Sequence, residues 1–246
     1  MSNTPDPWIP FRQPRPRARL RLFCLPYAGG GAYAYRTWAG GLAEHIEVCP
    51  VQLPGRENRL GEPAYARLDP LAAALSQALL PYLDRPFALF GHSMGSIIAY
   101  ELAQRLRAGH GLQPVHLLVS ARRAPQLPYL DPPCHPLPDP EFKARLREYN
   151  GTPAAVLDHP ELMGLLLPLL RRDFELNETY VPSTLAPLDC PVTAFGGEAD
   201  ATVSLAHLDA WRQITRGPFR RRLLPGDHFY LQQHAPRLWQ AIAEVL

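Results

Sequence analysis

The chain has 246 residues, with 25 Lys and Arg against 23 Asp and Glu, and a formal net charge of +2 at pH 7. Charges of both signs are interspersed along it, which argues against a nucleic-acid-binding surface. The length suits a single α/β domain, 1–246, built around one core. No apolar signal core begins the chain and no run approaches the ~18 apolar residues of a membrane helix, so we expect no membrane partner.

Strand-like and helix-like segments alternate along the chain. Residues 1–18 are rich in Pro and Arg and are expected to form an extended arm. Asp69-Pro70 is expected to cap a helix whose leucines recur at i+4 from Leu71 to Leu83, and residues 235–246 form a closing helix. The alternation predicts a mostly parallel sheet with helices on both faces. The candidate strands are 19–25, 47–52, 86–91, 114–120, 191–196 and 219–224.

A glycine-rich loop follows the first strand and reads Pro26-Tyr27-Ala28-Gly29-Gly30-Gly31-Ala32. Glycines allow backbone amides to approach a ligand closely. Phosphate binding is one use of such a loop, but the sequence contains neither G-x-x-x-x-G-K-[ST] nor a G-x-G-x-x-G that opens a helix. The loop is therefore a better candidate for supplying a backbone donor to a reacting carbonyl group.

Residues 91–95 read Gly91-His92-Ser93-Met94-Gly95, a G-x-S-x-G motif. An apolar run precedes the motif, and a segment with apolar residues at i, i+4 spacing follows it. This strand–turn–helix context is typical of a nucleophile elbow, whereas G-x-S-x-G alone also occurs in ordinary turns. A Cβ at Gly91 or Gly95 should collide with a neighbouring strand or helix. Ser93 is the predicted nucleophile.

Acyl transfer also needs donors for the oxyanion that develops on the carbonyl oxygen. In nucleophile-elbow enzymes one donor is the backbone amide that follows the nucleophile, here Met94. The second comes from the loop after an early strand. We assign it to the amide of Ala28, with Tyr27 and Gly29 as alternatives.

Residues 123–186 interrupt the alternation, because they are far longer than an ordinary connection between a strand and a helix. A proline cluster is followed by two helical patterns, 139–149 and about 160–180, and Pro168 should kink the second. We expect a lid over the active site, with Leu166 and Leu169 lining an acyl tunnel. The alternative is a helical insertion that only packs on the core.

A serine nucleophile needs a histidine base and a carboxylate that orients it, in the chain order Ser, acid, His. His228 lies just past the apolar end of a late strand, on a glycine-containing loop; the alternative is an ordinary loop histidine. The acid is predicted on the loop after the strand near 191–196, where Asp200 is our choice and Glu198 the runner-up. An Asp that only stabilises a turn remains the alternative for Asp200.

Four cysteines occur in the chain, and no two form a C-x-x-C pair. Two of them lie in predicted core strands. We therefore expect buried, reduced thiols, a state that favours a cytoplasmic location. The four are Cys24, Cys49, Cys134 and Cys190.

Four motifs together resemble the type II thioesterases of polyketide and non-ribosomal peptide synthesis, which have the α/β-hydrolase fold. They are Leu25-Pro26-Tyr27-Ala28-Gly29-Gly30, Gln52-Leu53-Pro54-Gly55-Arg56, Phe90-Gly91-His92-Ser93-Met94-Gly95 and Gly226-Asp227-His228-Phe229. The resemblance spans nearly the whole chain, from Trp8 onward, and the fatty-acid synthase chain-terminating thioesterases belong to the same wider family. Ser93, Asp200 and His228 each fall in the matching motif, which supports them as the triad.

The resemblance implies hydrolysis of acyl groups from the phosphopantetheine arm of an acyl or peptidyl carrier protein, chiefly acyl groups that stall the synthesis. It implies no metal and no resident cofactor, since phosphopantetheine arrives with the substrate, and we expect a monomer. One rival hypothesis is a carboxylesterase or lipase that acts on free esters. Another is a non-catalytic binding protein of the same fold.

Carrier proteins of this kind resemble acidic helical bundles, so basic residues near the tunnel mouth should contact them. The chain offers three groups of arginines: Arg122-Arg123, Arg171-Arg172 and Arg220-Arg221-Arg222. The side chains of Arg220-Arg221-Arg222 should point alternately to the two faces of a strand, and one of Arg122 and Arg123 could be buried. The lid pair, Arg171-Arg172, is therefore the first choice for the docking surface.

Overall fold

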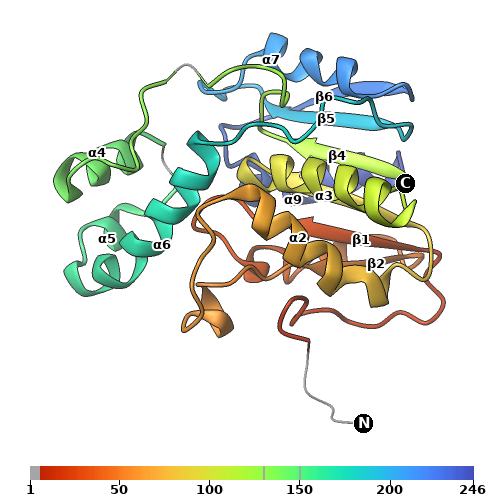
Figure 1. Cartoon of the computed structure of the whole chain (residues 1–246), viewed down its shortest axis with the longest axis horizontal. Coiled ribbons are helices and arrows are strands. Elements are labelled where there is room, and N and C mark those ends of the chain that lie inside the picture. Colours follow the sequence, from red (N-terminus) through yellow and green to blue (C-terminus); the bar gives the residue numbers. More distant parts are fainter. Residues whose placement is uncertain (1–5, 130, 150) are drawn as a thin grey trace.

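The computed structural model describes residues 6–129, 131–149 and 151–246 of the chain. Its centre is a six-stranded sheet, in the order β2-β1-β3-β4-β5-β6, in which every neighbouring pair of strands is parallel (Figure 1). The predicted strands match the observed ones to within two residues at each end. The strands are β1 (Leu20–Leu25), β2 (Ile46–Pro50), β3 (Phe87–His92), β4 (His116–Ser120), β5 (Val192–Gly197) and β6 (Phe219–Leu224).

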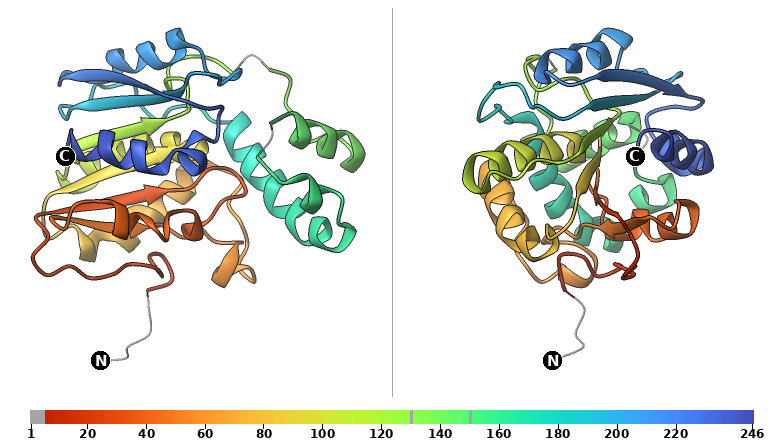
Figure 2. Two further views of the ribbon diagram at one scale, coloured as in Figure 1. Left: turned by 180° about the vertical axis from the view of Figure 1, so that it is seen from behind. Right: turned by 90° about the vertical axis from the view of Figure 1, so that its right-hand side faces the viewer.

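Helices cover both faces of the sheet, as predicted (Figure 2). The side chains of β1 alternate between two cores: Phe23 packs with the residues of α2 and α3, whereas Leu22 packs with those of α1 and α9. Burial on both faces explains why β1 to β5 read as largely apolar runs, whereas the edge strand β6 is mostly exposed. The helices that flank the sheet on its two faces are α1 (Trp38–Gly41), α2 (Leu68–Leu79), α3 (Met94–His110), α7 (Leu205–Asp209), α8 (Tyr230–Gln233) and α9 (Ala235–Ala243). Short 3-10 turns occur at Ala32–Tyr35, Glu57–Arg59, Leu80–Tyr82 and Ala210–Ile214.

The start of α2 differs from the prediction. The residue that precedes the helix with extended backbone is Arg67, so Asp69 lies inside the first turn and the prediction of Asp69 as the cap was wrong. The Asp69 side chain instead pairs with Arg105 of α3. An acidic residue in the first turn still interacts favourably with the helix dipole.

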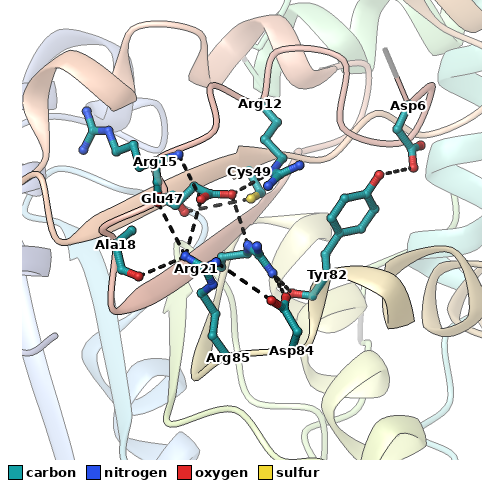
Figure 3. A network of polar contacts seen from close by, with 10 residues as sticks. All are labelled: Asp6, Arg12, Arg15, Ala18, Arg21, Glu47, Cys49, Tyr82, Asp84 and Arg85. Carbon is teal, nitrogen blue, oxygen red and sulfur yellow. Dashed lines mark hydrogen bonds and ion pairs between the residues drawn. The ribbon is translucent and has the colours of Figure 1, made fainter. Parts of the chain in front are cut away.

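The amino-terminal arm lies along β1 and β2, outside any helix or strand from Asp6 onward; residues 1–5 of the predicted arm lie outside the described residues. Figure 3 shows that Glu47 of β2 holds it. The Glu47 carboxylate is buried and accepts hydrogen bonds from Arg12 Nε (2.6 Å), Arg21 Nε (3.0 Å) and the backbone amide of Arg15 (3.1 Å). The arm is therefore fastened to the edge of the sheet by a buried charge network, away from the carboxyl ends of the strands.

Three helices, α4 (Asp139–Tyr149), α5 (Ala154–Leu157) and α6 (Pro160–Glu178), lie at the end of the sheet where the strands finish (Figure 1), and we refer to this group by the name of the expected lid. α6 continues through Pro168. None of the helices in the described ranges is long and apolar enough to cross a membrane. The lid has its own small core, made by Cys134, Phe142, Leu146, Leu157, Met163, Leu167 and Leu170.

Candidate active site

Ser93 stands on a tight turn between β3, which ends at His92, and α3, which begins at Met94. Its backbone has φ 52° and ψ −115°, a conformation that non-glycine residues rarely adopt. A Cβ on Gly91 would lie 2.0 Å from the carbonyl oxygen of Gly95, and a Cβ on Gly95 would lie 2.2 Å from that of Leu25. A Cβ at either glycine would therefore collide as expected from the sequence, because the turn brings α3 against β1 and β3.

His228 and Asp200 come from neighbouring strands. β5 ends at Gly197 and β6 ends at Leu224, and the loops after these two parallel strands meet. His228 Nδ1 lies 2.8 Å from Asp200 Oδ2, and the Asp200 side chain is fully buried. Thr202 donates to the other carboxylate oxygen from its backbone amide (2.8 Å) and its hydroxyl (2.7 Å).

These contacts set the ionisation of the acid. Burial alone would raise the pKa of Asp200, but the hydrogen bond and charge of His228, together with the bonds from Thr202, outweigh burial and hold the pKa below its usual value. Asp200 is therefore an ionised hydrogen-bond acceptor at neutral pH. Glu198, the runner-up, is exposed, so the structure brings Asp200 and not Glu198 to the imidazole.

The two backbone amides that were predicted to hold an oxyanion, those of Ala28 and Met94, have no hydrogen-bond partner among the described residues. Met94 is the first residue of α3, and the first amides of a helix have no partner inside it. In the glycine-rich loop, Gly29 donates its amide to Asp173 Oδ2 (2.7 Å) and Gly30 donates to the Tyr27 carbonyl (2.9 Å). The Ala28 amide donates to no residue in the described parts of the chain, and Ala28 lines the same cavity as Ser93.

A buried ion pair fixes the glycine-rich loop from the lid side. Asp173 of α6 receives Arg56 Nη2 at 2.8 Å and Arg56 Nη1 at 2.9 Å, and both side chains are almost fully buried. Arg56 Nη1 also donates to the Gly30 carbonyl at 2.9 Å. Because Asp173 accepts from the Gly29 amide as well, the pair joins the lid helix to the loop that carries Ala28. We call these contacts the Arg56–Asp173 clamp.

A series of hydrogen bonds made by His92, Ser120 and Tyr230 lies next to the imidazole of His228. The ring of His92 is buried 5.4 Å from the ring of His228, measured between centroids, and its Nδ1 lies 2.8 Å from Ser120 Oγ. Ser120 Oγ in turn lies 2.5 Å from the Tyr230 hydroxyl. Burial holds the pKa of His92 well below its usual value, and the positive charge that His228 can carry acts in the same direction. His92 is therefore a neutral neighbour of His228.

Ser93, Ala28 and His228 line one cavity, part of which is open to solvent. From the lid, the side chains of Leu146, Leu170 and Phe174 line it. The predicted tunnel residues do not: Leu166 packs against the core of the lid, and Leu169 is buried outside the cavity. The physical reason is that α6 is apolar on several sides, so the choice between neighbouring leucines depends on its rotation.

Arginine 171, predicted to dock the carrier, has a structural role in the lid. Its Nη1 donates to the His135 carbonyl and its Nη2 pairs with Asp139, both at 2.6 Å, so Arg171 fastens α6 to the start of α4. Arg172 is exposed and, among the described residues, pairs with Glu175 alone, one turn further along α6. Of the lid pair, Arg172 has the more exposed side chain, 57% against 26% for Arg171.

Sequence reasoning missed Thr202, Asp173 and His92. Asp200-x-Thr202 has the spacing at which an Asp side chain accepts from the amide two residues later, which is a readable signal. Asp173 is an acid in the apolar pattern of α6, three residues after Leu170, and such an intrusion calls for a buried partner.

Across the described residues, no group of three or more His, Cys, Asp or Glu side chains could hold a metal ion.

Comparison with known proteins places the chain in a family. Residues 20–246 match the thioesterase domain family. The gramicidin S biosynthesis protein GrsT of Aneurinibacillus migulanus is 46% identical over 216 residues, which cover 88% of this chain and 84% of that protein. The RedJ thioesterase from the prodiginine pathway of Streptomyces coelicolor has a TM-score of 0.86 at 42% identity, covering 93% of this chain and 86% of RedJ. BorB, the type II thioesterase from the borrelidin biosynthetic cluster, has a TM-score of 0.89 at 39% identity and covers 99% of both chains. The sequence-based prediction is thereby confirmed, and the chain belongs to the thioesterase domain family with the α/β-hydrolase fold.

Proposed function

We propose that the protein hydrolyses acyl thioesters with Ser93 as nucleophile, His228 as general base and acid, and Asp200 as the carboxylate that orients His228. The observation that carries this assignment is the shared cavity. Ser93 on its strained turn and His228, whose Nδ1 is held by a buried carboxylate, both open into it. A base held on one side by a carboxylate presents its other ring nitrogen to a nucleophile.

In the first half of the reaction, Ser93 Oγ bonds to the thioester carbonyl carbon while His228 Nε2 takes the hydroxyl proton. The amides of Ala28 and Met94 donate to the oxyanion of the tetrahedral intermediate. Its collapse breaks the carbon–sulfur bond, and the thiol leaves with the proton from His228. In the second half, water attacks the acyl-enzyme, His228 takes the proton of that water, and Ser93 regains it as the carboxylic acid departs.

The proposed substrate is an acyl group on the phosphopantetheine arm of an acyl or peptidyl carrier protein, and the proposed role is removal of aberrant or stalled acyl units. Two findings support this choice. The relatives named above belong to gramicidin S, prodiginine and borrelidin biosynthesis. The lining of the cavity also combines apolar side chains of the lid with polar side chains, which suits an acyl chain carried on a polar arm.

The test loads one carrier domain with acyl groups of graded length and compares their release with that of the matching pantetheine thioesters and of ethyl esters. We expect kcat/KM to be highest for the carrier-bound thioesters and lowest for the oxoesters. Oxoester hydrolysis that equals or exceeds thioester hydrolysis, with no gain from the carrier, would point to a carboxylesterase instead.

A further inference from the structure

A buried arginine of the cavity has no role in the mechanism above. Arg122 follows β4, and the residue between them, Ala121, adopts φ 50°, which turns the chain toward the cavity. The Arg122 carbonyl accepts a hydrogen bond from Trp211 Nε1 at 2.7 Å, so the backbone here is fixed. The residue is only 8% exposed, and it lines the same cavity as Ser93 and His228.

The Arg122 guanidinium lacks a counter-charge. Its Nη1 donates to Asn177 Oδ1 at 2.8 Å, but its Nε has no partner, and the side chain forms no ion pair with residues 6–129, 131–149 or 151–246. Burial lowers the pKa of Arg122 to about 10, and the neighbouring Arg123 contributes in the same direction. At neutral pH the group therefore remains a cation.

An unpaired buried charge is costly, because the protein interior does not replace the water that solvated it. Asn177 offers a neutral amide oxygen, which satisfies one donor without balancing the charge. The other charged groups that line the cavity are Arg123, the exposed Asp131 and His228. Arg123 is half-buried and stacks on Tyr129, with its guanidinium carbon 4.2 Å from the ring centroid. One exposed carboxylate thus faces two arginines, and the lining favours an anion.

We propose that Arg122 is a specificity-determining residue that binds the carboxylate of acyl groups bearing a second, distal carboxylate, that is, half-thioesters of dicarboxylic acids. The inference rests on the proposed function, since it names a substrate class for the same cavity. The Nε atom is enclosed, so the donor left for a carboxylate is Nη2, which makes no hydrogen bond with the described residues.

The test uses pairs of pantetheine thioesters with the same shape and different charge, because an isopropyl group has the outline of a carboxylate. Malonyl is paired with 3-methylbutanoyl, succinyl with 4-methylpentanoyl and glutaryl with 5-methylhexanoyl. The quantity measured is the ratio of kcat/KM within each pair. In the wild type we expect at least one pair to favour the carboxylate by about tenfold or more, as a charge-assisted hydrogen bond predicts.

Arg122→Gln should lower that ratio ~10–100-fold, mainly because kcat/KM falls for the carboxylated member. Arg122→Lys should give an intermediate ratio, because lysine keeps the charge but lacks the planar guanidinium. The matched control is Arg123→Gln, which removes a neighbouring cation that already stacks on Tyr129. It should leave the ratio within about threefold, since the stacked guanidinium is not the proposed ligand. An equal fall for both members of each pair, or no wild-type preference in any pair, would overturn the proposal.

A binding measurement separates this proposal from the proposed function and does not depend on the variants folding. Calorimetry on the wild type compares non-hydrolysable pantetheine thioethers that end in a carboxylate or in an isopropyl group. Binding of the carboxylated thioether about tenfold tighter supports the Arg122 site even if the enzyme hydrolyses none of the thioesters. Equal affinities would reject the site even if hydrolysis is fast.

Discussion

The catalytic loops and the lid are held in place by different kinds of contact. At the loops the constraint is backbone against backbone: a Cβ on Gly91, Gly95 or Gly197 would lie 2.0–2.3 Å from a carbonyl oxygen. In the lid it is side chain against side chain, through a small apolar core and the ion pairs of Arg171 and Asp173. We therefore expect substitutions in the lid to change which acyl groups are hydrolysed without moving the proposed triad, whereas the loops should tolerate little change.

The largest expected effect is that of Ser93→Ala. Loss of the nucleophile should lower kcat by at least about 10⁴-fold, while the fold is retained because the hydroxyl contributes little packing. Hydrolysis of an acyl-carrier and circular dichroism melting would be measured together. Ser76→Ala on α2, which also removes one serine hydroxyl but lies outside the cavity, is the control. Turnover within a few-fold of the wild type would contradict the role of Ser93.

Asp200→Asn should lower kcat by about 10²–10⁴-fold, because the amide cannot hold His228 in the same tautomer or stabilise its charged form. Glu198→Gln is the matched control and should stay within about threefold, since Glu198 is exposed and an exposed side chain has little effect. Steady-state kinetics on one thioester decides the matter. If Glu198→Gln is the more damaging change, the acid has been assigned to the wrong residue.

Asp200 should also leave a signature in the pH dependence of stability. Its pKa is lowered in the folded state, so its ionised form stabilises the fold above the unfolded value near 3.8, and this contribution is lost as the pH falls through the folded value. The difference in Tm between the wild type and Asp200→Asn should therefore shrink below about pH 4. A constant difference from pH 7 to pH 3 would show that the carboxylate is not stabilised in this way.

Asp173→Asn tests whether the lid positions the oxyanion loop. It weakens the acceptor for Gly29 and leaves Arg56 buried without a counter-charge, so we expect kcat to fall ~10–100-fold and stability to fall by a few kcal/mol, about 3–5. Adding Arg56→Met removes the unpaired charge and should restore most of the stability. Activity that recovers together with stability would mean that the Arg56–Asp173 clamp is only structural.

A smaller and more selective effect is expected from Leu170→Ala, because Leu170 lines the cavity from α6. A buried methylene is worth ~0.8 kcal/mol, so the preference for long acyl groups should change by about tenfold while the shortest groups are less affected. Leu166→Ala and Leu169→Ala, the residues predicted from the sequence, serve as controls that also remove leucines. A larger shift in chain-length preference for the controls would show that they line the acyl path after all.

The smallest effect is expected from Arg172→Glu, which should reduce carrier-bound turnover a few-fold and leave a pantetheine thioester unaffected, if docking is electrostatic. The advantage of the carrier substrate should also shrink as salt rises past ~0.15 M, where the Debye length is ~8 Å. Arg171→Glu should instead lower Tm and slow both substrates, since Arg171 fastens α6 to α4. Equal losses on both substrates for Arg172→Glu would remove it from the docking surface.

The fold could be predicted because its signals are local. Runs that are buried on both faces marked the five strands β1 to β5, and G-x-S-x-G with its flanks marked the turn between β3 and α3. Asp200 and His228 followed from chain order, because loops after neighbouring parallel strands meet at one edge of the sheet. The structure brings these two residues into contact, and their catalytic roles await the experiments above.

The lid contacts could not be predicted, because they depend on how α6 is rotated against the rest of the molecule. Leu166, Leu169 and Leu170 are equivalent in composition, and only packing decides which of them faces the cavity. The Arg56–Asp173 clamp joins residues 117 positions apart, with no periodic pattern to connect them. For the same reason the sequence suggested that Arg171 is a surface charge, although the partner of its side chain lies at the start of α4.

The turn that carries Ser93 has a consequence for how such a chain evolves. Ser93 and Ala121 adopt φ of 52° and 50° at the ends of two adjacent strands, and each such residue costs of order ~1–3 kcal/mol unless it is glycine. Selection for stability alone would favour glycine at position 93, and the hydroxyl would be lost with it. At position 93, stability therefore favours glycine, whereas the reaction requires serine. A lineage that no longer needs the reaction should become more stable as it becomes inactive.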